Sequence, residues 1–312
     1  MTLNYLLYIT LNTLFILVVS PLILGLIKKI KALAQGRLGP PLLQTYYNIF
    51  KLFKKEIVYS QNASFIMSIA PYLNIGFLVA AAVMVPVVFI PATDGSGNII
   101  LFLYLMVSAK FFMALAGLDA ASTFGGMGAS REMSLSAIIE PVTITSVAAL
   151  AFVLKTTDIP EMFATTLQSS LAQYPTLILI AFSLFIVIIM ETSRIPVDSP
   201  ETHLELTMIH EAMILEQTGP KLALMELSYG LKQTILMALL INIIFPYGLA
   251  DEASLYGISL SILSFTLKAL VLAVVIGIFE SMLAKIRLFR LPSFFMLALF
   301  FSFVTIVFEL LA

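Results

Sequence analysis

Long apolar runs dominate the hydrophobic pattern of this chain. Runs of about twenty residues, long enough to cross roughly 30 Å of hydrocarbon, recur along its whole length. They predict eight membrane-spanning helices, at residues 3–27, 65–90, 99–118, 134–154, 175–190, 220–247, 255–283 and 292–311. Alternating ten-residue strands are absent, so a barrel is not expected. The predicted fold class is an all-α polytopic membrane protein, with residues 1–312 forming a single integral membrane domain.

A different pattern marks residues 41–58, PLLQTYYNIFKLFKKEIV, between the first two spans. The apolar residues with helical spacing are Leu42, Tyr46, Ile49, Phe53 and Ile57, and the polar side carries Lys51, Lys54 and Lys55. This pattern predicts an amphipathic helix at the membrane interface. It would serve either as a basic anchor on anionic lipid or as one wall of a binding site.

The positions of lysine and arginine predict the orientation of the chain. The loops expected at 28–64, 119–133, 191–219 and 284–291 carry Lys28, Lys29, Lys31, Arg37, Lys51, Lys54, Lys55, Arg131, Arg194, Lys285, Arg287 and Arg290. The remaining loops and both tails carry only Lys155. Because basic residues favour the cytoplasmic side, these four loops are expected in the cytoplasm. Both termini are then non-cytoplasmic, and the expected location is the cell inner (plasma) membrane.

Composition agrees with a membrane protein and excludes several kinds of site. Apolar residues make up 60% of the 312 residues and charged residues 11%, and the mean hydropathy is +1.05. The absence of cysteine excludes disulfides, thiolate zinc sites and cysteine-ligated iron–sulfur clusters within this chain. No basic run has interleaved aromatic residues, so the lipid bilayer is an expected partner and nucleic acid is not.

Several ionisable residues nevertheless lie inside the predicted spans: Lys110, Glu140, Glu226, Lys232, Lys268 and Glu280. A charge at the bilayer centre costs about 2.5–3.5 kcal/mol on insertion scales, so such residues normally face a protein interior or a water-filled path. Two uses remain open: a buried polar path for ions, or structural ion pairs between helices.

Residues 191–219, ETSRIPVDSPETHLELTMIHEAMILEQTG, concentrate six of the 18 acidic residues and both histidines. If 200–218 is helical, Glu201, Glu205 and Glu216 share one face, while His203 and His210 share the opposite face. Like carboxylates raise each other's pKa, which is how a proton relay is held near neutral pH. Arg194 has two candidate partners in this segment, Glu191 and Asp198.

Motifs for catalysis or metal binding are incomplete. HEAMI (210–214) begins like a zinc-protease H-E-x-x-H, but Ile214 occupies the place of the second ligand. Neither a G-x-S-x-G elbow nor a phosphate-binding G-x-x-x-x-G-K-S/T is present. The glycine-rich stretch 117–132 is expected to be a flexible cytoplasmic loop. No catalytic residue and no metal site is therefore predicted in this chain.

Several motifs together resemble a known family over nearly all of the chain. They are GRLGPPLLQ with KLFKKE (36–56), AGLDAAS (116–122), GASREMSLSAIIEP (128–141), the E-x-x-R-x-P-x-D and P-E-x-x-x-E-L pattern from Glu191 to Leu206, and FESMLAKIRLFRLP (279–292). The chain resembles the membrane subunit of respiratory complex I that mitochondria call subunit 1. Its resemblance is greater to the membrane subunits of nickel–iron hydrogenases of the formate hydrogenlyase and hydrogenase-4 component C type.

This resemblance implies a non-catalytic subunit of an oxidoreductase complex, which docks a hydrophilic redox arm and couples electron transfer to proton or sodium movement. It implies hydrogenase large and small subunits and antiporter-like membrane subunits as partners, with no cofactor in this chain and nickel–iron and iron–sulfur centres in the partners. The implied ion path is Lys110, Glu140, Glu191, Arg194, Asp198, Glu201, Glu205, Glu216, Glu226, Lys232, Lys268 and Glu280. The implied arm-docking surface or quinone-like cavity is Arg37, Lys54, Glu56, Arg131, Glu132, His203 and His210.

The chain also departs from the complex I pattern. His203 replaces the middle acid of the P-E-x-E-x-E run, and the spacing to Glu216 and Gly219 is longer by about three residues. Because that segment frames the quinone pocket in complex I, the departure favours the hydrogenase branch. Two alternatives remain: the quinone-binding membrane subunit of a complex I-like NADH or ferredoxin dehydrogenase, and, more distantly, a stand-alone secondary transporter.

Overall fold

The computed structural model describes residues 3–58, 60, 62–90, 97–168, 174–198, 208–250 and 254–311. Within these ranges the chain is helical, apart from two isolated bridges. The helices are α1 (Leu3–Ala34), α2 (Gln44–Phe53), α3 (Phe65–Met84), α4 (Ile99–Asp119), α5 (Thr123–Leu154), α6 (Ile159–Gln168), α7 (Leu177–Glu191), α8 (His210–Ile214), α9 (Gly219–Ile244), α10 (Leu255–Met282) and α11 (Leu291–Leu311), with a 3₁₀ turn η3 (Leu288–Arg290).

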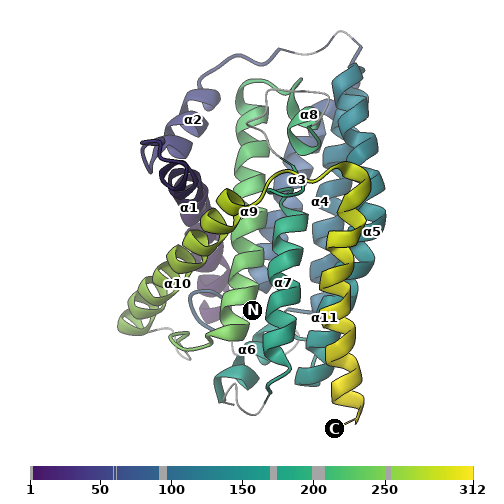
Figure 1. The fold of residues 1–312 in the computed structure, drawn as a ribbon. Helices are drawn as coiled ribbons and strands as arrows, with labels where there is room; N and C mark the ends of the chain where they lie inside the picture. The colour runs from purple at the N-terminus through teal and green to yellow at the C-terminus, as the bar shows by residue number, and fades with distance from the viewer. Residues whose placement is uncertain are drawn as a thin grey trace.

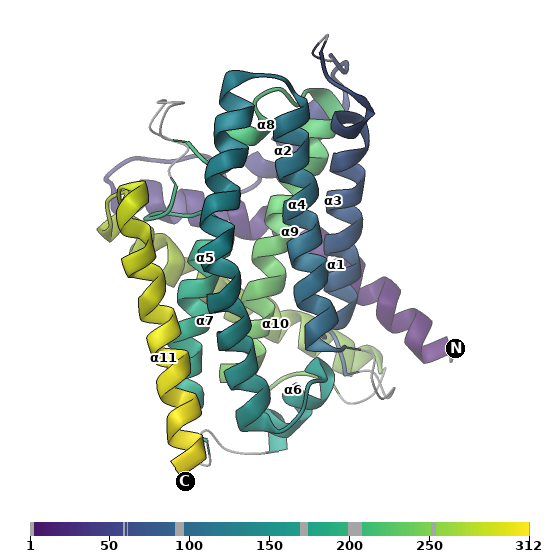
Figure 2. The same ribbon diagram turned by 90° about the vertical axis from the view of Figure 1, so that its right-hand side faces the viewer.

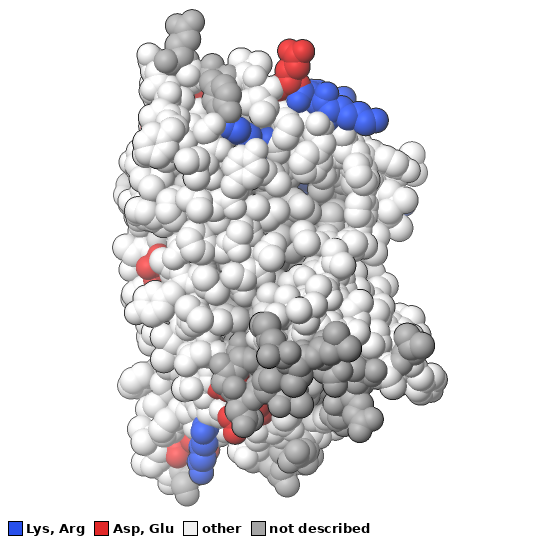
Figure 3. All heavy atoms as spheres, turned by 180° about the vertical axis from the view of Figure 1, so that it is seen from behind, with Lys and Arg blue, Asp and Glu red and all other residues white. Residues whose placement is uncertain are grey.

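The eight predicted spans correspond to α1, α3, α4, α5, α7, α9, α10 and α11. Within the described residues, seven of these helices are long and apolar enough to cross a membrane, and α7 is a shorter apolar helix of 15 residues. The prediction of an all-α polytopic membrane protein is therefore confirmed. Figure 3 agrees, because apolar atoms fill the middle of the face it shows and charged residues gather mainly toward its two ends.

Helix α9 forms the centre of the bundle and packs against α1, α2, α3, α7 and α10. Helix α11 lies against α5 and α7, whereas α10 leans away from the bundle and packs mainly on α1 (Figure 1). Helices α2 and α8 and the connection from α10 to α11 lie at one end of the molecule (Figures 1 and 2). Helix α6 and the C-terminus lie at the opposite end. We call these the α8 end and the α6 end.

The length of α7 determines where its last residue lies. Fifteen residues form a helix of about 22 Å, which is shorter than the roughly 30 Å of hydrocarbon in a bilayer. The chain therefore leaves helical structure at Glu191 before it has crossed the full apolar thickness. A carboxylate at this point needs partners from neighbouring helices.

The glycine-rich stretch 117–132 is not the flexible loop that its composition predicted. Helix α4 continues to Asp119, and α5 begins at Thr123 after Ser122, whose Oγ accepts a hydrogen bond from Gly125 N at 3.0 Å. A Cβ atom at Gly125 would lie 2.6 Å from Gly117 O, and one at Gly128 would lie 2.8 Å from Ala212 Cβ. These glycines therefore allow close packing of α4, α5 and α8, as small residues do between membrane helices.

Two other boundaries differ from the predictions. Helix α1 continues to Ala34, so Lys28, Lys29 and Lys31 belong to a helix and not to the following loop. Helix α6 lies in a connection for which no helix was predicted. The amphipathic helix is present as α2, with Thr45 and Ile49 buried.

Candidate functional site

Glu191 is held between two lysines from different helices. Its Oε2 lies 2.7 Å from Lys232 Nζ on α9, and its Oε1 lies 3.1 Å from Lys110 Nζ on α4. Thr143 Oγ1 on α5 is 3.5 Å from Oε1. The Glu191 and Lys110 side chains are buried, and that of Lys232 is 13% exposed. Four helices thus surround this carboxylate, and we call Lys110, Thr143, Glu191 and Lys232 the Glu191 site.

A second group forms around Glu280 on α10. Arg194 Nη1 donates to its Oε1 at 2.6 Å, and Lys31 Nζ on α1 lies 3.8 Å from its Oε2. Arg194 Nε also donates to Gln233 Oε1 at 3.0 Å, and its guanidinium lies 5.8 Å from the centre of the Tyr229 ring. Since a guanidinium offers several donors in one plane, it can join α9 and α10 to the loop after α7.

Asp198 connects this loop to two other segments at the α8 end. Its Oδ2 accepts hydrogen bonds from the backbone N–H of Ile209 at 2.8 Å and of His210 at 3.1 Å. Its Oδ1 lies 2.8 Å from Lys285 Nζ, in the connection between α10 and α11. The loop 192–198 therefore contacts both the start of α8 and the connection that precedes α11.

Burial and charge shift two titrating groups of α8. Burial, with Lys232 nearby, lowers the pKa of His210 to about 4, although Asp198 opposes this shift. Burial raises the pKa of Glu211, against the influence of Lys28. His210 is thus neutral at pH 7, and its ring lies 5.0 Å from that of Tyr229.

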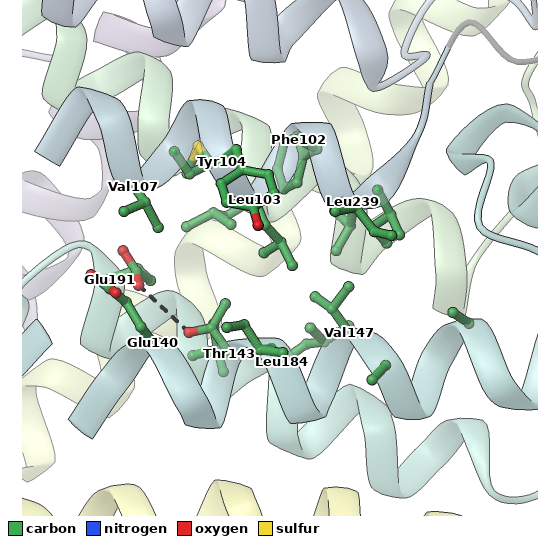
Figure 4. A pocket seen from close by; sticks show the side chains of 18 of the residues that line it. Phe102, Leu103, Tyr104, Val107, Glu140, Thr143, Val147, Leu184, Glu191 and Leu239 are labelled. Carbon is green, nitrogen blue, oxygen red and sulfur yellow. Dashed lines mark hydrogen bonds between the residues drawn. The ribbon is translucent and has the colours of Figure 1, made fainter. Parts of the chain in front are cut away.

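An apolar cavity of about 620 Å³ extends from the Glu191 site between α4, α5, α7 and α9. Figure 4 shows Glu140, Thr143 and Glu191 together at one end, with Phe102 and Leu239 farther along. The Glu140 side chain lines this end of the cavity, beside Glu191. The cavity therefore brings a second carboxylate next to the two lysines.

The structure places other predicted residues away from these groups. Lys268 donates to the carbonyls of Phe245, at 2.7 Å, and Tyr247, so it satisfies the C-terminal end of α9. Arg37, Lys54 and Glu56 are exposed near α2. Two further acids, Glu216 and Glu226, are half-buried. Glu201, His203 and Glu205 lie outside the described residues, and of the expected helix 200–218 the described part contains α8.

Glu132 lies in a different environment from the predicted docking surface. Its side chain is buried, and Lys110 and Lys232 are the cations with which it interacts. Its neighbour Arg131 is half-buried and donates through Nη1 to Met208 O at 3.0 Å, which joins α5 to the segment before α8. Glu132 therefore faces the Glu191 site.

Sequence reasoning missed four partners: Lys31, Thr143, Tyr229 and Gln233. Thr143 could have been found, because it lies three residues after Glu140 and so shares its helix face. Lys31 was assigned to a loop because the end of α1 was placed too early. Tyr229 and Gln233 carried no signal in the sequence, since uncharged residues of α9 have no marked position before the helices are assembled.

The fold and these sites define a polytopic α-helical membrane protein with linked groups of buried charge. The family described as NADH dehydrogenase matches residues 6–310, and the chain belongs to this family. It is 34% identical over 277 residues to "Hydrogenase-4 component C" of Escherichia coli (strain K12), covering 87% of this chain and 85% of that protein. It is 30% identical over 287 residues to "Formate hydrogenlyase subunit 4" of the same strain, covering 90% and 91%.

One more relative and one solved structure complete the comparison. A subunit of the NADH-quinone oxidoreductase of Anaplasma marginale (strain St. Maries) is 29% identical over 204 residues, covering 57% of this chain and 56% of that protein. The fold matches a chain in the structure of the membrane-bound sulfane sulfur reductase, an archaeal respiratory membrane complex. That match has a TM-score of 0.81 at 17% identity, over 97% of this chain and 100% of the other, and concerns the fold alone.

Proposed function

We propose that this chain is the membrane-anchor and ion-coupling subunit of a membrane-bound hydrogenase complex. The observation that carries the proposal is the Glu191 site, in which a buried carboxylate lies between two lysines. Three residues later Arg194 begins the loop that reaches Asp198 and the α8 end. A movement or charge change at that end therefore has a short covalent route to a buried ion pair.

The relatives support the hydrogenase branch of the family. Two of them are named as components of hydrogenase-4 and formate hydrogenlyase, and each is covered over most of its length. In this proposal, hydrogenase large and small subunits dock at the α8 end and carry the nickel–iron and iron–sulfur centres. Antiporter-like subunits lie beside the chain in the inner membrane.

The basic residues support a cytoplasmic location for the α8 end. Lys51, Lys54 and Lys55 lie at α2, and Arg287 and Arg290 lie in the connection to α11, which is at the same end (Figure 1). Lys155 follows α5 toward the opposite end. By the positive-inside rule, the α8 end faces the cytoplasm and the two termini face outward.

Purification through a tag on this chain tests the proposal. The whole complex is isolated in a mild detergent, its subunits are identified by mass spectrometry, and dihydrogen evolution and metal content are measured. Co-purification of a nickel-containing subunit with hydrogenase activity is expected. An arm without nickel, with quinone-dependent activity, would instead assign the chain to the quinone-binding branch. A chain that purifies alone and moves a solute in liposomes would identify a transporter.

A further inference from the structure

Ser136 on α5 has an unusual environment for a buried hydroxyl. Its side chain is 2% exposed, and within the described part of the chain its Oγ has no hydrogen-bond partner. Other buried hydroxyls in the spans donate to the carbonyl one turn earlier, as Thr143 does to Ile139 O at 3.0 Å and Ser228 does to Leu224 O at 2.7 Å. An unpaired buried hydroxyl is costly, so its use needs another explanation.

Two carboxylates flank Ser136 on the same face of α5. Glu132 lies four residues before it and Glu140 four residues after it, so both point to the same side of the helix at 100° per residue. Glu132 is 5% exposed, whereas Glu140 lines the cavity next to Glu191 (Figure 4). The three side chains form a polar stripe that leads to the Glu191 site.

The charges around this stripe allow one carboxyl to carry a proton. The groups that interact with Glu132 include Lys110 on α4, Lys232 on α9, Glu191 on α7 and Asp198 in the following loop. Asp198 has its own cation, Lys285. Three carboxylates, of Glu132, Glu140 and Glu191, then face two ammonium groups. One of the three can be neutral while each lysine keeps an anionic partner.

We propose that Glu132, Ser136 and Glu140 form a proton relay along α5, which supplies the Glu191 site from the α8 end. The inference rests on the proposed coupling function and deepens it. Glu132 lies nearer the α8 end, where its neighbour Arg131 bonds Met208 O. Glu140 lies at the cavity.

The transfer conserves atoms and electrons. The O–H bond of the Glu132 carboxyl breaks, the Ser136 oxygen accepts that proton as it releases its own, and a new O–H bond forms on the Glu140 carboxylate. Each gap corresponds to a rise of about 6 Å along the helix, which a side chain and one bridging water span with hydrogen bonds of ordinary length. Rotation of the Ser136 hydroxyl restores the starting arrangement.

The test compares Glu132→Gln and Ser136→Ala with Ser228→Ala in the whole complex. Ser228 is a matched control because its hydroxyl is buried and bonds only its own helix among the described residues. Inverted membrane vesicles are used, with proton uptake followed by a pH-sensitive dye and redox turnover measured in the same vesicles with and without a protonophore. The amount of assembled complex is measured by immunoblot.

The relay predicts that Glu132→Gln abolishes proton uptake while turnover with protonophore continues. Ser136→Ala should lower the ratio of protons moved to turnovers, and Ser228→Ala should leave it unchanged. Glu132→Asp, which keeps the acid, should recover part of the uptake. A wild-type ratio in both Glu132→Gln and Ser136→Ala overturns the relay, as does a loss explained entirely by less complex.

Two further variants keep the result decisive. Ser136→Ala removes an unpaired hydroxyl and should fold, so its ratio decides the question if Glu132→Gln does not assemble. Glu191→Gln separates the relay from the proposed function. If Glu191→Gln abolishes uptake but Glu132→Gln does not, the relay alone is wrong. If Glu191→Gln keeps a wild-type ratio, the coupling function itself is wrong.

Discussion

Two polar groups join α5 and α7 to a third helix, and they differ in charge. In one, the hydroxyls of Ser146, Ser183 and Ser302 from α5, α7 and α11 form a closed ring, with Oγ separations of 2.7, 2.7 and 2.9 Å. In the other, Glu191 lies between Lys110 and Lys232. Three neutral hydroxyls are sufficient to hold helices together.

The difference teaches what the charges are for. A charge within the membrane costs several times what a hydroxyl costs, and buried ion pairs are often no more stabilising than apolar residues of the same volume. Helix packing alone therefore does not account for the Glu191 site. The serine ring, which holds α11 in place, shows how the same chain solves a purely structural task.

The largest expected effect is that of removing Glu191. Glu191→Ala leaves two buried lysines without their shared carboxylate, and breaking a buried pair in this way costs about 3–5 kcal/mol of folding free energy. Replacing all three charges, with Lys110→Met, Glu191→Leu and Lys232→Met, should restore the melting temperature but not ion movement. Melting of the purified complex checks both results, and recovery of coupling in the triple variant would contradict the comparison.

Arg194→Ala should have the next largest effect. Glu280 keeps Lys31 at 3.8 Å, so the expected cost is near the lower limit for a broken buried pair, about 3 kcal/mol. The loop 192–198 would also lose its contact with α9 and α10, and the yield of assembled complex should fall. Blue-native electrophoresis measures this yield. Normal yield with unchanged proteolysis of the loop would show that Arg194 does not hold it.

Acid should destabilise the charged side of the molecule through His210. Its pKa is about 4 when folded, below the usual value of about 6.5. The unfolded chain therefore binds the extra proton first, and stability is lost as pH falls from about 6.5 to about 4, by about 3 kcal/mol in total. Melting across this range should show a smaller loss in His210→Gln than in the wild type. Equal losses would mean that other groups cause the change.

The smallest effect is expected in the serine ring. Ser302→Ala removes one interhelical hydroxyl, and such bonds in membranes contribute about 0.6–2 kcal/mol. The melting temperature should fall slightly, while the ratio of protons moved to turnovers stays at the wild-type value. A lost ratio in a fully assembled Ser302→Ala complex would break the distinction between the neutral and the charged group.

The sequence was a reliable guide to the spans and a weaker guide to the contacts between them. Apolar length alone placed all eight helices, because the bilayer imposes that length. It misjudged residues 123–133, since glycines that allow close packing look like those of a loop. Lys268 and Lys232 have the same appearance in the sequence, yet one bonds carbonyls at the end of α9 and the other bonds Glu191.

Other predictions stand where the sequence left them. The motif from Glu191 to Asp198 correctly marked a segment of buried charge, but its partners on α1, α4, α9 and α10 appear only when the helices are assembled. Glu201, His203 and Glu205 lie outside the described residues, so their place in the ion path stays a prediction. Glu132 changed most, from an expected surface residue to one that faces Lys110 and Lys232.

The most direct test of the coupling role is the ratio of protons moved to redox turnovers for Glu191→Gln in inverted vesicles. The amide keeps the volume of the side chain and accepts hydrogen bonds from the lysines, but it cannot carry the charge or the proton. The account predicts that the assembled complex continues to turn over and that proton uptake is lost. A wild-type ratio at normal complex levels would contradict it, and would reduce the Glu191 site to a link between helices.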